Sequence, residues 1–266
     1  MTIALNGLER LIERGYQVVF LSHAKAILNI DYPDTLAEIE SVLLDLAIPM
    51  ETLIKGGGGE HETTQGLRKR LFDYGWKKHH FEIRKFIDGV ARESISHEVD
   101  HVRTTSVGKV ALEIEWNNKD PFFDRDLENF KRLHGEGAIS AGVILTRGAS
   151  LQDGMIEAVR RFAESRHATS FEALAELVTP TPRQRRHVQD RVGRGVSFAE
   201  AWAAVFVGDK FGQATTHWRK LEDRVHRGVG NPCPLLLIGI PDRVIQFEDG
   251  LPLTRRPLPL FSEGQG

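Results

Sequence analysis

The most informative segment of the sequence for the fold is Asp100-His-Val-Arg-Thr-Thr-Ser-Val-Gly-Lys-Val-Ala-Leu-Glu113-Ile-Glu115-Trp-Asn-Asn-Lys-Asp120. It contains two strand signals, over 94–104 and 107–117, with a glycine-containing turn between them. In the second strand every other residue is apolar, and Glu113 and Glu115 occupy the positions between. The pattern predicts a β-hairpin whose second strand buries one face and carries carboxylates on the other.

The carboxylates of this hairpin are expected to converge. Glu113 and Glu115 stand about 7 Å apart on one strand face, because each residue rises roughly 3.3 Å. The hairpin also brings Asp100 beside Glu113. Three acids that approach one another repel unless a cation neutralises them or water reaches them. Oxygen ligands of this kind favour Mg²⁺. The alternative is an amphipathic strand with a solvated acidic face.

The residues before the hairpin predict helices and then a strand. Apolar side chains in residues 1–50 follow helical spacing, and 64–74 reads as a basic amphipathic helix. A strand from about residue 81 runs into Asp88-Gly89, a dipeptide typical of a two-residue hairpin turn. We therefore expect this strand to pair with the one that carries Asp100.

The residues after the hairpin predict a helix, a strand and further helices. Asp124 or Asp126 is expected to cap the first helix, and the apolar run 139–146 predicts a buried strand. The next helices are expected over 152–165 and 170–177.

The last third of the chain predicts more helices and a second buried strand. Thr181 is the expected N-cap of a helix that begins at Pro182. A buried strand is expected over 234–240, with 243–247 paired beside it. The sum is one α/β domain over 1–266, in which a mixed central β-sheet is flanked by helices. Its expected parts are a helical N-terminal part at 1–50, a core at 80–150 and a helical part at 180–230.

The composition excludes some classes of protein, and the net charge hides an uneven distribution of charge along the chain. The single cysteine, Cys233, excludes a disulfide framework, and no apolar run reaches the roughly 20 residues of a membrane helix. The net charge of −2 argues at first against a nucleic-acid partner. However, residues 1–64 hold four basic and ten acidic residues, whereas 66–86, 183–194 and 210–227 are locally basic. Local field determines attraction to phosphates, although each basic stretch also reads as a solvated helix face.

Two segments carry a family resemblance: Ile95-Ser-His-Glu-Val-Asp100 and Val110-Ala-Leu-Glu113-Ile-Glu115-Trp-Asn-Asn-Lys-Asp-Pro-Phe-Phe-Asp-Arg-Asp126. Together they resemble the BamHI/BglII-like type II restriction endonucleases of the PD-(D/E)XK nuclease superfamily. The resemblance implies that superfamily's core fold, with Asp100 as the first acid and Glu113 as the second. Glu115 stands where most of the superfamily has lysine, as in the BamHI-like branch.

The resemblance implies a metal-dependent mechanism. Asp100 and Glu113 are the expected Mg²⁺ ligands, and Mn²⁺ is the expected substitute for this cofactor. Glu98 is the favoured further acid, since alternation places it on the face of Asp100; Glu82 and Glu60 are alternatives. Glu115 is expected to orient the attacking water or act as its general base. Without lysine, more of the charge neutralisation is left to metal ions.

The implied function is that of a type II site-specific deoxyribonuclease. Such an enzyme hydrolyses double-stranded DNA and leaves a 5′-phosphate and a 3′-hydroxyl. Contacts to DNA are expected from Lys55, Arg68, Lys77, Lys78, Arg103, Asn117, Asn118, Lys119, Arg183, Arg185, Arg186 and Lys220. A palindromic site implies a homodimer, for which the helices of 1–50 are candidate elements.

The resemblance also implies a cytoplasmic prokaryotic protein, with no membrane partner and with a cognate DNA methyltransferase as its genetic partner. Two alternatives stay open at this point. One is a repair or junction nuclease of the same superfamily, which cuts by DNA structure. The other is a DNA-binding module without catalysis, against which the presence of all three acids argues.

Overall fold

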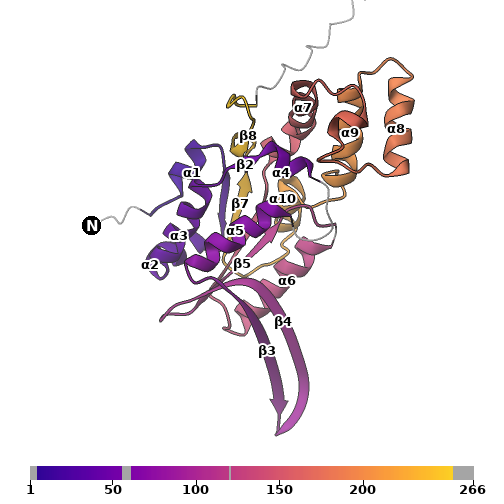
Figure 1. Cartoon of the computed structure of the whole chain (residues 1–266). Coiled ribbons are helices and arrows are strands. Elements are labelled where there is room, and N and C mark those ends of the chain that lie inside the picture. Colours follow the sequence, from indigo (N-terminus) through magenta and orange to yellow (C-terminus); the bar gives the residue numbers. More distant parts are fainter. Residues whose placement is uncertain (1–4, 56–60, 120, 254–266) are drawn as a thin grey trace, which may run out of the picture.

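A six-stranded mixed sheet forms the centre of the molecule (Figure 1). The computed structural model describes residues 5–55, 61–119 and 121–253, with only the backbone at 92–95. The strand order is β1-β7-β6-β5-β4-β3; β5, β6 and β7 run parallel, and the other neighbours are antiparallel. The strands are β1 (Gln17–Leu21), β3 (Lys77–Ile87), β4 (Val90–Thr104), β5 (Lys109–Glu115), β6 (Ala141–Arg147) and β7 (Leu235–Ile240). The predicted mixed sheet flanked by helices is confirmed.

Helices cover both faces of this sheet, and the sheet separates the hydrophobic core into two parts. The larger core contains buried residues of α1 (Glu9–Glu13), α2 (Ala24–Ile30), α3 (Pro33–Leu44), α4 (Met50–Ile54), α5 (Glu62–Asp73), α7 (Ala149–Ser165), α8 (Pro182–Val192) and α9 (Phe198–Lys210). The smaller core lies against α6 (Phe122–Gly135) and α10 (Trp218–His226). No helix in the described part of the chain is long and apolar enough to cross a membrane.

Strand alternation in β5 sets which side chains meet which layer. Val110, Leu112 and Ile114 enter the larger core, and Ala111 enters the smaller one beneath α6. This alternation confirms the predicted apolar face. Glu113 and Glu115 continue the row that begins at Ala111, so the acids occupy positions on the face that α6 covers.

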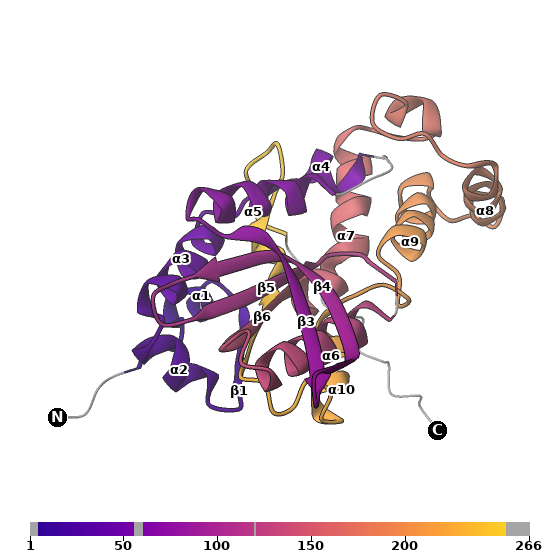
Figure 2. The ribbon, with the colours of Figure 1, turned by 90° about the horizontal axis from the view of Figure 1, so that it is seen from below.

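The strands β3 and β4 extend beyond the body of the molecule as a two-stranded arm (Figures 1 and 2). Only the last four residues of β4, from His101, pair with β5; the rest pair with β3 alone. The turn at the tip has φ of 51° at Asp88 and 78° at Gly89. Positive φ at both central residues is the requirement of a type I′ turn, so the predicted hairpin is confirmed.

The expectation that residues 1–50 are all helical is wrong. Gln17–Leu21 forms β1, which pairs antiparallel with β7 at one edge of the sheet, and Ile48–Pro49 forms the short strand β2. The run Gln17-Val-Val-Phe-Leu is rich in β-branched and aromatic residues and follows Gly15, which has a φ of 90°. These are strand signals within a segment whose flanking helices dominate the periodicity.

Two expectations in the second half of the chain are also wrong. Phe171–Leu174 forms one 3₁₀ turn in place of a helix over 170–177. Residues 243–247 do not join the central sheet: a 3₁₀ turn at Asp242–Val244 follows Pro241, and β8 (Ile245–Gln246) pairs parallel with β2. Proline cannot continue a sheet ladder, and the chain leaves the sheet there. By contrast, Thr181 caps α8 through a full capping box, as predicted.

Candidate active site

A cavity of about 440 Å³ opens where β5 ends. The three predicted catalytic acids, Asp100, Glu113 and Glu115, all line it. Two cations also face it, Arg68 from α5 and Arg125 from α6. Residues from two strands, two helices and the segment after β5 therefore meet at one point of the fold.

An irregularity in β4 places Asp100 at this cavity. Lys77 is opposite Val102 and His79 is opposite Val99, so β4 has one more residue than β3 between these pairs. Such bulges re-aim a side chain, and they are frequent next to active sites. Here the Asp100 side chain is 41% exposed, whereas His101 is buried with Nδ1 3.3 Å from the Leu112 carbonyl.

The backbone N–H of Asp100 donates to Oε1 of Glu113 across 3.4 Å. The hairpin therefore brings these two acids together, as the sequence predicts. Two cations hold the Asp100 carboxylate: Arg68 lies 3.4 Å from Oδ2 and Lys78 lies 3.5 Å from Oδ1. Lys78 also bonds Glu98 at 2.6 Å. Glu98 thus shares a lysine with Asp100, but it is not part of the described cavity wall.

The two glutamates of β5 are buried, and this burial changes their acidity. Burial raises the pKa of Glu113 well above its usual range, and the charges of Asp126 and Asp100 raise it further. Burial and then Asp126 raise the pKa of Glu115 to about 9. Nδ2 of Asn118 donates to Glu115 Oε2 at 2.8 Å. Without a bound cation, this site favours protonated glutamates.

Asp126 is a fourth acid of the site, and sequence reasoning missed it. The expected capping by Asp124 or Asp126 is wrong, because α6 begins at Phe122 directly after Pro121 and Asp124 instead accepts from Arg224 of α10. Asp126 is fully buried in the second turn of α6. Its Oδ1 accepts from Nε of Arg125 at 2.8 Å, while its Oδ2 has no hydrogen-bond partner among the described residues.

A sequence signal for this buried acid does exist. Asp126 stands three residues after Phe123 and four before Phe130, on the same helix face, and both phenylalanines enter the smaller core. An aspartate on the apolar stripe of an amphipathic helix needs a partner, since burying an unpaired charge is costly. The apolar stripe of this helix therefore predicts that Asp126 faces the side of the sheet that carries Glu113 and Glu115.

The donor set suits a hard divalent cation. Asp100 and Glu113 offer carboxylate oxygens at one wall of an open cavity, and Mg²⁺ is usually bound by one or two carboxylates together with waters and substrate phosphate. The raised pKa of Glu113, caused by burial and by neighbouring acids, shows that its negative charge lacks a counter-ion, which a bound cation would supply. Within the described ranges, no preformed group of three or more His, Cys, Asp or Glu side chains could hold a metal ion.

Several residues expected to contact DNA lie at the site, and others have internal partners. Arg68, Asn117 and Asn118 line the cavity. Arg103 instead forms a bidentate pair with Glu38, through Nε at 3.0 Å and Nη2 at 2.8 Å. This guanidinium therefore has a structural partner inside the protein.

The remaining expected DNA contacts are spread over the surface. Lys77 lies at the root of the arm, and Lys119 is exposed and forms a backbone bridge with Thr215. Lys55 pairs with Glu62 at 3.7 Å. Lys220 lies on α10. The alternative acid Glu60 lies outside the described ranges.

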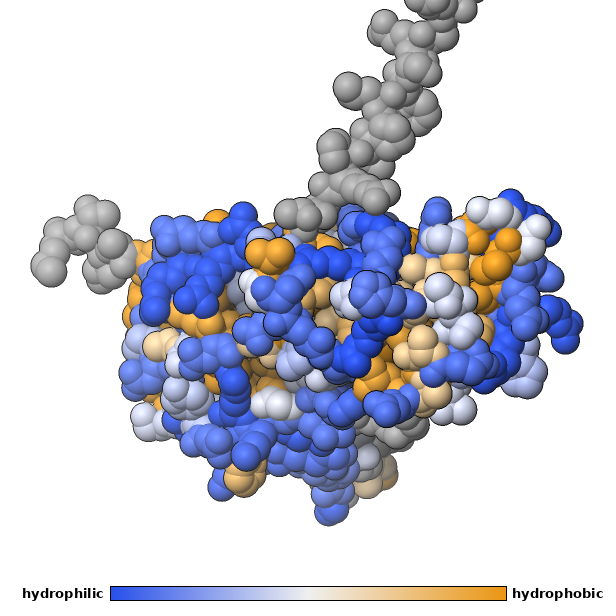
Figure 3. Space-filling model, turned by 45° about the horizontal axis from the view of Figure 1, so that its top comes forward, coloured by the Kyte–Doolittle hydropathy of each residue, from blue (hydrophilic) through white to orange (hydrophobic). Residues whose placement is uncertain are grey.

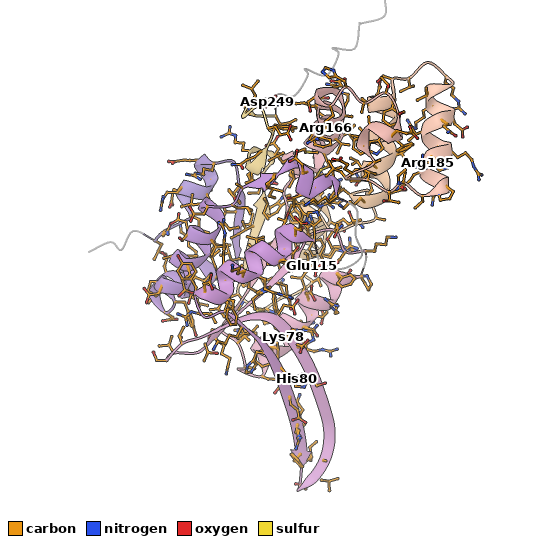
Figure 4. All side chains as sticks on the ribbon, viewed as in Figure 1. Lys78, His80, Glu115, Arg166, Arg185 and Asp249 are labelled. Carbon is orange, nitrogen blue, oxygen red and sulfur yellow. The ribbon has the colours of Figure 1, made fainter. Side chains whose placement is uncertain are left out.

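Helix α8 carries three of the expected contacts far from the acids. Figure 4 places Arg185 in this helix, with Glu115 in the middle of the molecule and Lys78 at the arm. Arg183 and Arg186 are exposed, and Arg185 lies 3.9 Å from Glu172. Figure 3 shows the outer edge of the molecule on the side of α8 as hydrophilic. The structure does not bring α8 to the cavity wall.

His61 is a second cavity residue that the sequence reasoning missed. It is the N-cap of α5, and its Nδ1 accepts from the Thr63 N–H at 3.2 Å. Burial lowers the pKa of His61 to about 4, with smaller effects from Lys210 and Arg147. The imidazole is therefore neutral near pH 7. Its only sequence signal is its place just before a helix, after a glycine run.

Arg147, at the end of β6, fixes the strand end beside the acids. Its guanidinium is fully buried and donates to the Trp116 carbonyl at 2.6 Å and to Gln152 Oε1 at 2.5 Å. It also donates to Oγ1 of Thr215 at 2.6 Å and to the Thr216 carbonyl at 2.7 Å. Burial lowers the pKa of this arginine to about 9. One side chain thus ties the exit of β5 to α7 and to the loop before α10.

The comparison with known families agrees with this geometry. A family model described as restriction endonuclease BglII/BglIII matches residues 16–240, which is most of the chain. The match spans the arm, the three predicted catalytic acids and α6. None of the curated proteins matches the chain.

Proposed function

Because the chain belongs to the family of BglII/BglIII restriction endonucleases, we propose that it is a type II enzyme that cuts double-stranded DNA at a specific sequence with the help of Mg²⁺. Family membership makes it a nuclease that acts on DNA. The observation that supports the finer proposal is the meeting of Asp100 and Glu113 at one cavity wall, with Glu115 beside them.

Asp100 and Glu113 would hold the metal ion, and Mn²⁺ is an expected substitute for Mg²⁺. A bound Mg²⁺ supplies Lewis acidity at the scissile phosphate and lowers the pKa of a coordinated water. On metal binding, Asp100 would leave Arg68 and Lys78, which hold its two oxygens in this structure. Those two cations would then be available to DNA phosphates.

Glu115 is suited to the attacking water. Asn118 fixes its Oε2 by a hydrogen bond, so the carboxylate has a set orientation. Its raised pKa makes it a stronger base once it is ionised. In-line attack by that water leaves a 5′-phosphate and a 3′-hydroxyl.

DNA binding would combine the cavity wall with the basic surfaces. Arg68 from the wall and the exposed arginines of α8 supply phosphate contacts, which position the duplex. Asn117 and the α8 residues are candidates for reading base edges. A palindromic target requires a homodimer, with the helices of the first 50 residues as candidate contacts. A cognate DNA methyltransferase would protect the host's own sites.

Digestion of supercoiled plasmid in Mg²⁺ tests this function. The wild-type protein should produce discrete fragments, and run-off sequencing of their ends should give one recurring sequence. Glu113→Gln should leave the plasmid intact. Glu128→Gln is the matched control, because Glu128 is a partly exposed acid of α6 that pairs with Lys131. Cutting confined to branched DNA would contradict the proposal and favour a junction nuclease.

A further inference from the structure

Helix α6 supplies the cavity with a cation that β5 does not provide. The position two residues after Glu113 is a carboxylate, Glu115, so the strand itself carries no basic group there. Arg125 of α6 lines the same cavity, with Nη2 3.9 Å from Oε1 of Glu115. We propose that Arg125 is a catalytic residue that contacts the scissile phosphate of DNA; this inference rests on the proposed function.

Two contacts fix the orientation of the Arg125 guanidinium. Its Nε and Nη2 both lie 2.8 Å from Oδ1 of Asp126. The ring of Phe122 lies against the guanidinium, with Cζ 4.4 Å from the ring centroid. An arginine held by a carboxylate and by an aromatic face has already lost much of its rotamer freedom. Binding a phosphate then costs less ordering entropy, which is the advantage of preorganised charge.

The two residues of the Arg125–Asp126 pair differ in their exposure, and this difference shows which of them can reach a ligand in the cavity. Asp126 is fully buried, whereas the side chain of Arg125 is 51% exposed and faces the cavity. The buried member anchors the pair, and the exposed member presents a planar donor fork to the cavity. That fork matches the geometry of a phosphate, to which arginine donates in a bidentate manner.

The charge balance of the wall favours the same role. Asp100, Glu113 and Glu115 line the cavity, and Asp126 lies beneath them. Once Glu113 and Glu115 are ionised, as metal binding requires, a phosphate that enters meets repulsion from all four acids. Arg68, the other arginine of the wall, is paired with Asp100. Arg125 is therefore the cation that stands beside Glu115, where the attacking group is expected and negative charge develops during phosphoryl transfer.

The test compares Arg125→Ala and Arg125→Lys with Arg132→Ala, a change to the other arginine of α6, which is exposed. In Mg²⁺, we expect Arg125→Ala to lower kcat on plasmid DNA by about 100-fold or more. Added guanidinium should restore part of that rate. Arg125→Lys should retain less than a tenth of the rate, because ammonium lacks the fork. Arg132→Ala should stay within twofold of the wild type.

A second readout needs no metal. In EDTA, the slope of log affinity against log salt should fall by about 0.9 in Arg125→Ala, the value for one lost phosphate contact. The slope should not change in Arg132→Ala. Both measurements are made on the full chain.

A purely structural role has its own signature, since Arg125→Ala leaves Asp126 buried without its cation. The double variant Arg125→Ala/Asp126→Asn removes that charge and restores folding, and we expect it to remain as slow as Arg125→Ala. A double variant that regains the wild-type rate would overturn the inference, as would an Arg125→Ala enzyme that cuts normally. Wild-type protein that leaves DNA intact in Mg²⁺ would instead contradict the proposed function itself.

Discussion

The end of β5 and helix α8 are the two regions that the sequence marks for function, and they differ in how firmly packing holds them. Every residue from Val110 to Glu115 is buried, and Arg147 ties the following residue to α7 and to the loop before α10. In α8 only Val188 is buried, and the helix contributes to the core through that one side chain. Packing therefore fixes the positions of the acids, whereas α8 offers charge on an exposed surface.

Because packing holds them differently, the end of β5 and helix α8 should respond differently to substitution. Changes at the end of β5 should alter chemistry and stability, because each side chain there has fixed partners. Changes in α8 should alter only the long-range attraction to phosphates. The following experiments test this division.

The largest effect should come from the acids. Asp100→Asn or Glu113→Gln should reduce cleavage by more than the roughly 10- to 100-fold that outer-sphere partners of a metal cost. DNA binding should be unchanged or tighter, because a charge that repels phosphate is lost. Rates under single-turnover conditions, with filter binding in EDTA, would check both.

Glu98 sharpens this test as a neighbouring acid on the same strand. It pairs with Lys78 and is half exposed, so Glu98→Gln should change the rate by less than tenfold. A complete loss of cleavage in Glu98→Gln would make it a metal ligand, as the sequence suggested.

A large effect on stability should come from Arg147→Met. The substitution leaves several buried carbonyls without a donor, and each such group costs about 1–3 kcal/mol. We expect the free energy of unfolding to fall by about 3 kcal/mol in urea. The control Arg186→Met on α8 should stay within about 0.5 kcal/mol, as exposed substitutions usually do. Equal losses in the two variants would contradict the contrast drawn between the regions.

The next effect is a dependence of metal affinity on pH. A carboxylate must be ionised to bind a cation, and burial raises the pKa of Glu113, a proposed ligand, well above its usual range, while the pKa of Glu115 beside it is raised to about 9. The affinity for Mn²⁺ should therefore rise from pH 6 to pH 9, with release of protons. Calorimetric titration in buffers of different ionisation enthalpy would count those protons. An affinity for Mn²⁺ that does not change with pH would contradict a site whose buried glutamates lack a counter-ion.

The same shift predicts how the metal-free protein responds to pH. A glutamate with a raised folded-state pKa binds more protons in the folded than in the unfolded state between about pH 4.5 and 9. Its contribution to stability is present below that window and is lost as the pH rises through it. Glu115→Gln should flatten the decline in urea midpoint between pH 6 and 9, whereas Glu128→Gln should not.

The smallest effect should come from α8. Arg183→Ala/Arg186→Ala should lower the salt slope of DNA binding by up to about 2, at roughly 0.9 per phosphate contact. The cleaved sequence should stay the same if these arginines only position the duplex. Arg161→Ala is the control, since Arg161 is paired with Asp249 at 2.7 Å. A change in the cleaved sequence would give α8 a role in base reading.

The sequence predicted the site where local rules were sufficient. Alternation along β5 and the Asp88-Gly89 turn determine which face holds Glu113 and bring β3 onto β4. The approach of Asp100 to Glu113 follows from hairpin pairing. These features depend on neighbours within about 15 residues, where strand geometry leaves few choices.

The missed features depend on contacts between distant segments. The bulge that turns Asp100 outward appears only in the pairing of β3 with β4. Arg147 reaches the loop at Thr215 and Thr216, and nothing local predicts that partner. The strand β1 was hidden because the helices that flank it dominate the first 50 residues. Tertiary packing overrides local propensity in such cases.

Anomalous diffraction from crystals grown in Mn²⁺ would show whether Asp100 and Glu113 form a divalent-metal site. We expect an anomalous peak between the two carboxylates, within about 2.0–2.3 Å of an oxygen of each. In those crystals Arg68 and Lys78 should no longer hold Asp100. A Mn²⁺ peak elsewhere, with Asp100 still paired to those cations at saturating metal, would rule out this metal site.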